Sequence, residues 1–194
     1  MLEPESKSPS SQLQEIAQNF RLTGWISFWA QLVLGVIAAV VLGFASLSRD
    51  VAVATNQRSV GTGVGIFFAV IAVITLGASL FWAFRYTRIS RQLQSSNPNN
   101  RPRKADTIQL LQLGMSINLV GLLLSLLGAQ AIVGALLAKS LTLPQTGLGV
   151  YQIDPSRTIR TLDILVVQAN TNTVAAHFAG LVGSLWLLNR INRH

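Results

Sequence analysis

The sequence predicts an all-α integral membrane protein, a four-helix bundle, on the strength of three observations. Half of its 194 residues are hydrophobic and only 11% are charged, against about 25% in soluble domains. The charges are clustered, and long uncharged runs separate the clusters. The sequence also contains no cysteine, which excludes disulfides and thiol chemistry.

Four uncharged runs are long enough to cross a bilayer as helices. A hydrocarbon core of about 30 Å needs about 20 helical residues, because backbone groups in lipid must be hydrogen-bonded within their own segment. The runs form a single membrane domain, residues 22–190, and leave 191–194 as a short C-terminal tail. The spans are predicted at about 22–48, 59–84, 107–138 and 164–189.

Three of these helices are expected to be longer than their apolar runs. The second should continue to about residue 94, because the arginines after the run share one helical face, and Pro98 stops it. Asp106 and Gln109 are spaced as a capping box that opens the third. Asp154 before Pro155 is typical of an N-cap and first turn, so the fourth should start near residue 155.

Residues 1–21 are expected to form an N-terminal tail. They include Glu3, Glu5 and Glu15, whereas signal and transit peptides are basic and poor in acids. Apolar residues recur at helical spacing between Leu13 and Phe20. This spacing predicts a short amphipathic helix lying in the membrane interface, with a frayed tail as the alternative.

The positive charges predict that both termini face the cytoplasm or its stromal equivalent. With four spans, the termini and the loop between the second and third spans share one side, which also holds most of the Lys and Arg residues. The net charge of +8 therefore indicates contact with anionic lipid headgroups and not with nucleic acid. The positive residues on this side are Lys7, Arg21, Arg190, Arg193 and the basic cytoplasmic loop of Arg85, Arg88, Arg91, Arg101, Arg103 and Lys104.

The tryptophans support the same orientation. Their amphipathic rings favour the membrane–water interface, and all four lie toward the side that holds the termini. The predicted interfacial anchors are Trp25, Trp29, Trp82 and Trp186.

Small and amide-bearing residues form stripes that predict helix contacts in the first and third spans. Membrane helices associate through close backbone approach, so such stripes mark contact faces. The first stripe recurs every four residues, whereas the third alternates steps of four and three, a period typical of a left-handed seam. The helix-packing residues are Gln31, Gly35, Ala39 and Gly43 in the first span and Gly114, Asn118, Gly121, Ser125 and Gly128 in the third.

The fourth span carries a candidate intramembrane polar site. Helical spacing places Asn170, Thr173 and His177 on one face and Gln168 and Asn172 on roughly the opposite face. A helix that is polar on both faces cannot face lipid, so it should be surrounded by protein or line a water-containing cavity.

His177 is the one titratable side chain within the four runs, and two hypotheses account for it. In the functional hypothesis it relays protons or binds a passing ion. In the structural hypothesis, which we favour, it is a hydrogen-bond partner of Asn118, Gln130 or Gln31 across a helix seam.

Two strings of residues are recognisable. The first is Gly24–Trp29 followed by Gln31, and the second comprises Gln168, Ala169, Asn172, Thr173, His177, Phe178, Gly180 and Leu181. Together they resemble a four-helix family of the chloroplast inner envelope and its cyanobacterial relatives, and the resemblance covers about residues 20–190. That family has been described both as a subunit of the inner-envelope protein translocon and as a permease for iron.

The resemblance implies two functions. The favoured one is a non-enzymatic subunit or scaffold of a membrane complex, whose partners are copies of itself or other membrane subunits. The alternative is an iron permease, an oligomer in which His177 residues from several copies surround one axis, with the metal ligands otherwise unknown. No cofactor is predicted. An enzyme is not expected, because the sequence does not offer the set of catalytic groups that an active site needs. The expected location is a cyanobacterial plasma or thylakoid membrane.

Overall fold

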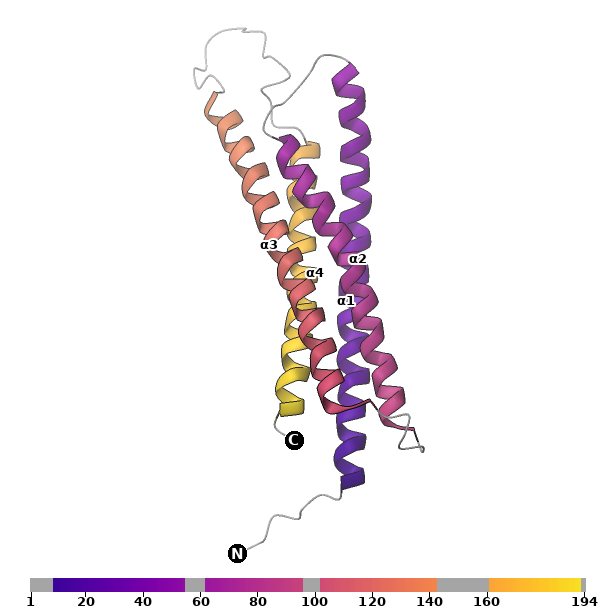
Figure 1. The fold of residues 1–194 in the computed structure, drawn as a ribbon. Coiled ribbons are helices and arrows are strands. Elements are labelled where there is room, and N and C mark those ends of the chain that lie inside the picture. Colours follow the sequence, from indigo (N-terminus) through magenta and orange to yellow (C-terminus); the bar gives the residue numbers. More distant parts are fainter. Residues whose placement is uncertain (1–8, 55–61, 96–101, 143–160, 193–194) are drawn as a thin grey trace, which may run out of the picture.

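The protein folds into four long helices that lie side by side in one bundle (Figure 1). This computed structural model describes residues 9–54, 62–95, 102–142 and 161–192, and no strand occurs among them. The predicted all-α, four-helix architecture is confirmed. The helices are α1 (Pro9–Ala54), α2 (Thr62–Leu93), α3 (Lys104–Thr142) and α4 (Thr161–Asn192).

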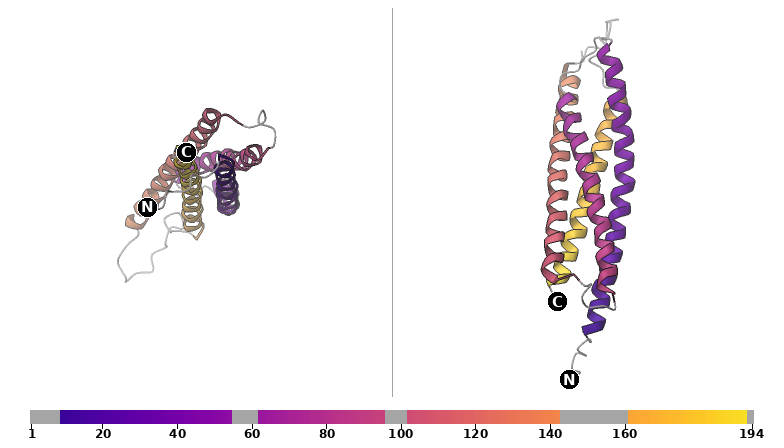
Figure 2. Two further views of the ribbon diagram at one scale, coloured as in Figure 1. Left: turned by 90° about the horizontal axis from the view of Figure 1, so that it is seen from below. Right: turned by 45° about the vertical axis from the view of Figure 1, so that its right-hand side comes forward.

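Each helix contacts its neighbours in chain order, and α4 closes the bundle by packing against α1. In addition α2 contacts α4 across the middle of the bundle. The view in the right panel of Figure 2 shows the four helices running nearly along one common axis. This arrangement brings residues of α2, α3 and α4 together at the centre.

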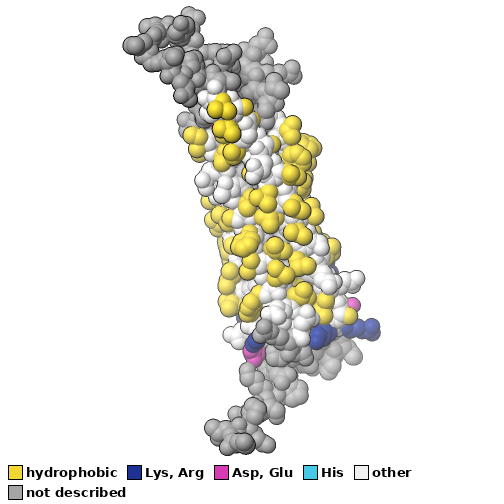
Figure 3. Space-filling model, turned by 90° about the vertical axis from the view of Figure 1, so that its left-hand side faces the viewer, with side chains coloured by type: hydrophobic (Ala, Val, Ile, Leu, Met, Phe, Trp, Pro, Cys, Tyr) yellow, Lys and Arg dark blue, Asp and Glu magenta, His cyan; other side chains and the backbone are white. Residues whose placement is uncertain are grey.

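All four helices are long and apolar enough to cross a membrane. The flank of the bundle seen in Figure 3 is largely hydrophobic, and most of the charged side chains visible in this view gather at its lower end. The start of α1, the end of α2, the start of α3 and the end of α4 all lie at that end. We call it the basic end, after its exposed residues Arg85, Arg88, Arg91, Arg103 and Lys104.

Arg101 and the expected start of the fourth helix near residue 155 lie outside the described residues. The second helix ends at Leu93. The compartment that the basic end faces stays a prediction.

The N-terminal segment differs from the expected tail. α1 runs without interruption from Pro9, and Phe20 is buried in a cluster with residues of α2, α3 and α4. The Ser90 hydroxyl of α2 donates a hydrogen bond to the Ala17 carbonyl oxygen at 2.7 Å, and Arg190 of α4 pairs with Glu15. The amphipathic face predicted from the sequence therefore packs against the other helices, and the expected separate interfacial helix is wrong.

The contact face of α1 also differs from the predicted stripe. Gln31 and Gly35 are buried, but Ala39 and Gly43 are exposed, and nothing lies within 4 Å of the position a Gly43 Cβ would take. A step of four residues overshoots one turn of about 3.6 residues, so a strict four-residue stripe rotates away from its partner. The buried residues instead follow a mixture of three- and four-residue steps: Gly24, Ser27, Gln31, Gly35, Ala38, Leu42 and Ala45.

Adjacent alanines of α1 test this seam. Ala38 is fully buried in the apolar cluster that α1, α2, α3 and α4 share, whereas Ala39 is exposed. Ala38→Leu should lower the free energy of unfolding by about 1–3 kcal/mol through overpacking. Ala39→Leu should change it by less than about 0.5 kcal/mol. Unfolding of the purified protein in mixed micelles measures both, and equal effects would contradict the assigned seam.

Candidate functional site

Five polar side chains, contributed by all four helices, meet at the centre of the bundle. We call them the central polar cluster. All of them except Thr75, which is half-buried, are inaccessible or nearly so. They are Gln31 of α1, Thr75 and Ser79 of α2, Asn118 of α3 and His177 of α4.

Asn118 is the hub of this cluster. Its Oδ1 accepts hydrogen bonds from Gln31 Nε2 at 3.1 Å and from the Ser79 hydroxyl at 2.7 Å. Its Nδ2 donates to the Gly114 carbonyl oxygen at 2.9 Å, which fixes the orientation of the amide. The Ser79 hydroxyl also lies 3.1 Å from Gln31 Oε1. One amide on α3 therefore connects α1 with α2.

His177 joins α4 to the same hub. Its Nδ1 lies 3.3 Å from Asn118 Oδ1, and its Nε2 lies 3.1 Å from the Ala72 carbonyl oxygen and 3.4 Å from the Thr75 hydroxyl. The Thr75 hydroxyl itself donates to Ala72 O at 2.8 Å. Both ring nitrogens are thus within hydrogen-bonding distance of protein oxygens. The imidazole bridges α4 to α2 and α3, as the structural hypothesis expects.

Two glycines make room for these side chains. A Cβ added to Gly121 would overlap the His177 ring, and one added to Gly180 would overlap the amide nitrogen of Gln31 and Oδ1 of Asn118. Gly121 belongs to the stripe predicted for the third span, whose five members are all buried. That stripe packs inside one chain and is therefore not itself available for contact with a second copy.

Polar contacts continue above and below the central polar cluster. Toward the far end, Asn170 Nδ2 donates to the Ser125 carbonyl oxygen at 2.7 Å. Toward the basic end, the Tyr86 and Ser184 hydroxyls lie 3.1 Å apart. Buried Thr173 is satisfied within α4, donating to Ala169 O at 3.0 Å. The polar seam therefore follows the inner face of α4 along its middle part, from Asn170 to Ser184.

The outer face of α4 is not enclosed by the described helices of this one chain. Gln168 is exposed and Asn172 is half-buried. Gln168 Nε2 donates to Asn172 Oδ1 at 3.2 Å, so the two amides one turn apart partly satisfy each other. The structure therefore brings Asn170, Thr173 and His177 together and leaves Gln168 and Asn172 facing outward.

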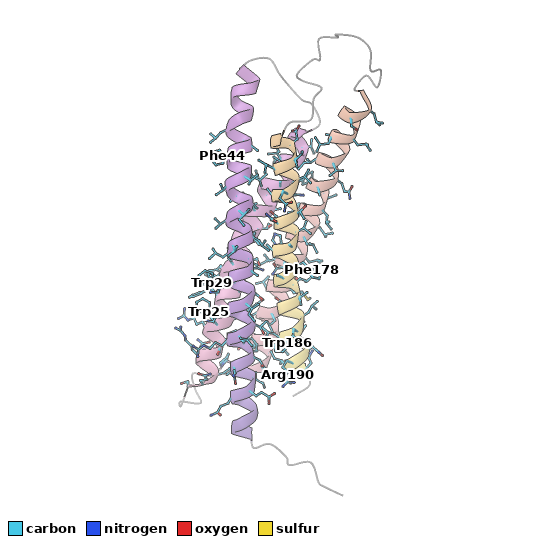
Figure 4. The ribbon with its side chains drawn as sticks, turned by 180° about the vertical axis from the view of Figure 1, so that it is seen from behind. Trp25, Trp29, Phe44, Phe178, Trp186 and Arg190 are labelled. Carbon is cyan, nitrogen blue, oxygen red and sulfur yellow. The ribbon has the colours of Figure 1, made fainter. Side chains whose placement is uncertain are left out.

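The tryptophans divide into two groups. Trp25 and Trp29 stack with ring centroids 6.2 Å apart and, like Trp186, are exposed in the half of the bundle nearer the basic end (Figure 4). Trp82 is half-buried, and its Nε1 is buried with no hydrogen-bond partner among the described residues. Because its N–H points away from the surface, Trp82 does not fit the interfacial role predicted for it.

Thr75 and Ser79 of the second span were not predicted as site residues. The buried positions of that span alternate steps of three and four in the same way as those of α3. These positions are Ala69, Ala72, Leu76, Ser79, Ala83 and Tyr86. This spacing indicates a helix-contact face with Ser79 at its middle, and it could have identified Ser79 from the sequence.

The described residues hold no group of three or more His, Asp or Glu side chains that could bind a metal ion. His177 has no accessible surface and is enclosed by its own bundle. Copies of the chain cannot bring their His177 side chains together around an axis, so the expected inter-copy iron site is wrong in its geometry.

These features define a class, the polytopic α-helical membrane proteins with a hydrogen-bonded polar interior. The chain belongs to the DUF3611 family, described as a protein of unknown function, whose model matches residues 10–192. This match and the one that follows confirm the resemblance inferred from the two sequence strings.

The chain is also 36% identical over 185 residues to an Arabidopsis thaliana protein named "Protein TIC 21, chloroplastic". The alignment covers 94% of this chain and 60% of that relative. The chain thus spans about three-fifths of the relative's length. No solved structure matches the chain.

Proposed function

We propose that this protein is a non-enzymatic subunit or scaffold of a membrane complex similar to the inner-envelope protein translocon. The relationship to the TIC 21 protein supports this role, and so does the interior of the bundle. The groups of the central polar cluster form hydrogen-bond contacts with one another. Such a network is better suited to holding helices together than to acting on a substrate.

The observation that carries the proposal is the outward amide pair of Gln168 and Asn172. At about 1.5 Å per residue, Asn172 lies roughly 21 Å along α4 from the exposed Trp186 and so within a hydrocarbon core of about 30 Å. Thr171 beside them is also exposed. Amides at that depth are costly against lipid but favourable against the polar groups of another helix. The outer face of α4 therefore forms the contact with a partner, either a second copy or another membrane subunit.

Replacing both outward amides tests this role. The wild type should migrate as a complex on native gels in mild detergent, and the double variant Gln168→Leu/Asn172→Leu should lose most of that complex, because leucine cannot supply the polar contacts. Its own unfolding should match the wild type, since neither amide contacts another helix through a hydrogen bond within the described residues. Gln112→Leu, an exposed amide on α3, is the control and should leave the complex intact. An unchanged complex in the double variant would refute the proposed interface.

The polar seam itself favours the second candidate, an iron permease. Its candidate route would then run through the interior of one bundle, past His177 and Asn118, and not along an axis between copies. Vesicles that contain the purified protein distinguish the two functions. Uptake of Fe²⁺ that exceeds protein-free vesicles and is lost in His177→Ala would replace the scaffold proposal, whereas no excess uptake supports it.

We further propose that the basic end faces the cytoplasm or stroma, in a cyanobacterial plasma or thylakoid membrane. The concentration of Lys and Arg at that end supports this orientation. No cofactor is needed for the scaffold role.

A further inference from the structure

A cleft of about 600 Å³ lies between the end of α2 and the start of α3, at the basic end. Its walls have two distinct chemistries. One part is apolar, and the other carries two guanidinium groups and one carboxylate. The residues that matter here are Phe81, Phe84 and Leu110 on the apolar side and Arg85, Arg88 and Asp106 on the charged side.

The two arginines are exposed and free to bind a ligand. Arg85 and Arg88 are one turn apart on α2, so both guanidinium groups can reach the same cleft. Neither forms an ion pair within the described residues. A second cleft of about 630 Å³ adjoins the first through Phe84 and Arg88 and adds Arg91. The local charge is therefore positive, even with Asp106 present.

The cleft lies at the depth of lipid headgroups. The ring of Phe84 is 6.2 Å from that of Phe28 on α1. Phe28 in turn packs edge-on against Trp25 and Trp29, each at 5.8 Å. These exposed tryptophans mark the boundary between hydrocarbon and water. Phe81, which is 58% exposed, lies one turn further from the basic end, toward the hydrocarbon. A lipid at this boundary would place its phosphate beside the arginines and its acyl chains beside the phenylalanines.

We propose that this cleft is a binding site for a single anionic phospholipid with a hydroxyl-bearing headgroup, of the phosphatidylglycerol type. The guanidinium groups of Arg85 and Arg88 bind the phosphodiester, since the planar fork of arginine matches phosphate oxygens. Phe81 and Leu110 contact the acyl chain. The Asp106 carboxylate accepts a hydrogen bond from a headgroup hydroxyl and repels a doubly charged phosphate monoester. This site concerns a lipid and is independent of the proposed protein complex.

The test uses the full-length protein in vesicles of phosphatidylcholine with a minor fraction of phosphatidylglycerol. Native mass spectrometry after mild extraction should find phosphatidylglycerol retained by the wild type. Arg85→Gln/Arg88→Gln should reduce retention on the order of tenfold or more, since each positive residue near the headgroups contributes about 1 kcal/mol. Arg21→Gln/Lys104→Gln removes the same charge from exposed positions that line neither cleft, and it should retain the lipid.

Asp106→Asn tests the choice of headgroup. It should raise the retention of phosphatidic acid relative to phosphatidylglycerol, because the repelling carboxylate is gone. Three outcomes would overturn the proposal: an equal loss in both double variants, equal retention of phosphatidylcholine by the wild type, or displacement of the lipid by inorganic phosphate. The first would indicate unspecific charge attraction, the second an apolar groove without selectivity, and the third a site for a soluble anion.

Discussion

Asn118→Leu should lower the free energy of unfolding by about 2–3 kcal/mol, because it leaves several buried groups without their partner. The Asn118 amide oxygen accepts hydrogen bonds from Gln31 and Ser79 and lies within hydrogen-bonding distance of His177. A buried donor that loses its acceptor costs about 1–3 kcal/mol, although interhelical bonds in membranes are often weaker, about 0.6 kcal/mol on average. The effect at this position is large because two donors from different helices, Gln31 Nε2 and the Ser79 hydroxyl, share one acceptor.

Unfolding in mixed micelles, followed by tryptophan fluorescence, measures this change. Gln112→Leu is the matched control, an amide on the same helix that is exposed and whose loss should change the free energy of unfolding by less than about 0.5 kcal/mol. Combining Asn118→Leu with Ser79→Ala should give less than the sum of the two single effects, because both remove the same hydrogen bond. Additive effects would show that the two side chains are not coupled.

Gly180→Ala should destabilise the bundle by about 1–3 kcal/mol or more, as overpacking of a close-packed interior does. The added methyl group would overlap the Gln31 amide nitrogen and Asn118 Oδ1, so α4 would have to move away from α1 and α3. Gly134→Ala is the control, because nothing lies within 4 Å of its Cβ position. There the more restricted alanine should be neutral or stabilise the helix by about 0.5–1 kcal/mol.

Melting temperatures of the two variants, measured in the same detergent, should therefore move in opposite directions or leave Gly134→Ala unchanged. Gln31→Ala added to Gly180→Ala should recover part of the loss by removing the overlapping amide. If both alanine variants behaved alike, the close approach of α4 to α1 and α3 would be wrong.

The sequence was sufficient for the spans and for the inner face of α4. Charge is so costly in hydrocarbon that its absence from a run marks a helix, and periodicity then places Asn170, Thr173 and His177 on one side. The seam of α3 was found because its glycines already follow the 3.5-residue period. Asn118 was correctly named as a partner of His177, since a buried imidazole needs a polar group at its own depth.

Other features could not be predicted from the sequence of a single helix. Ala38 and Ala39 of α1 are chemically identical, and only the partner helices decide which one is buried. The Thr75 hydroxyl can bond to its own helix, and Thr75 lies outside the three-and-four spacing that marks Ser79, so the sequence of α2 did not indicate that Thr75 joins the cluster. Trp82 has an amphipathic ring like the other tryptophans, but its neighbours on α3 turn it inward. In each case the deciding information is the packing of helices distant in the chain.

The contribution of α4 to the central polar cluster also bears on the biogenesis of the protein. Chains are synthesised from the N-terminus, so Gln31, Ser79 and Asn118 are made before His177. A nascent or truncated chain that lacks α4 has no imidazole opposite Asn118 and no helix covering the polar face that α1 and α3 turn toward it. The cluster is therefore complete only after α4 has been made. A membrane protease or chaperone that detects exposed amides would distinguish chains that lack α4 from chains that contain it by this feature.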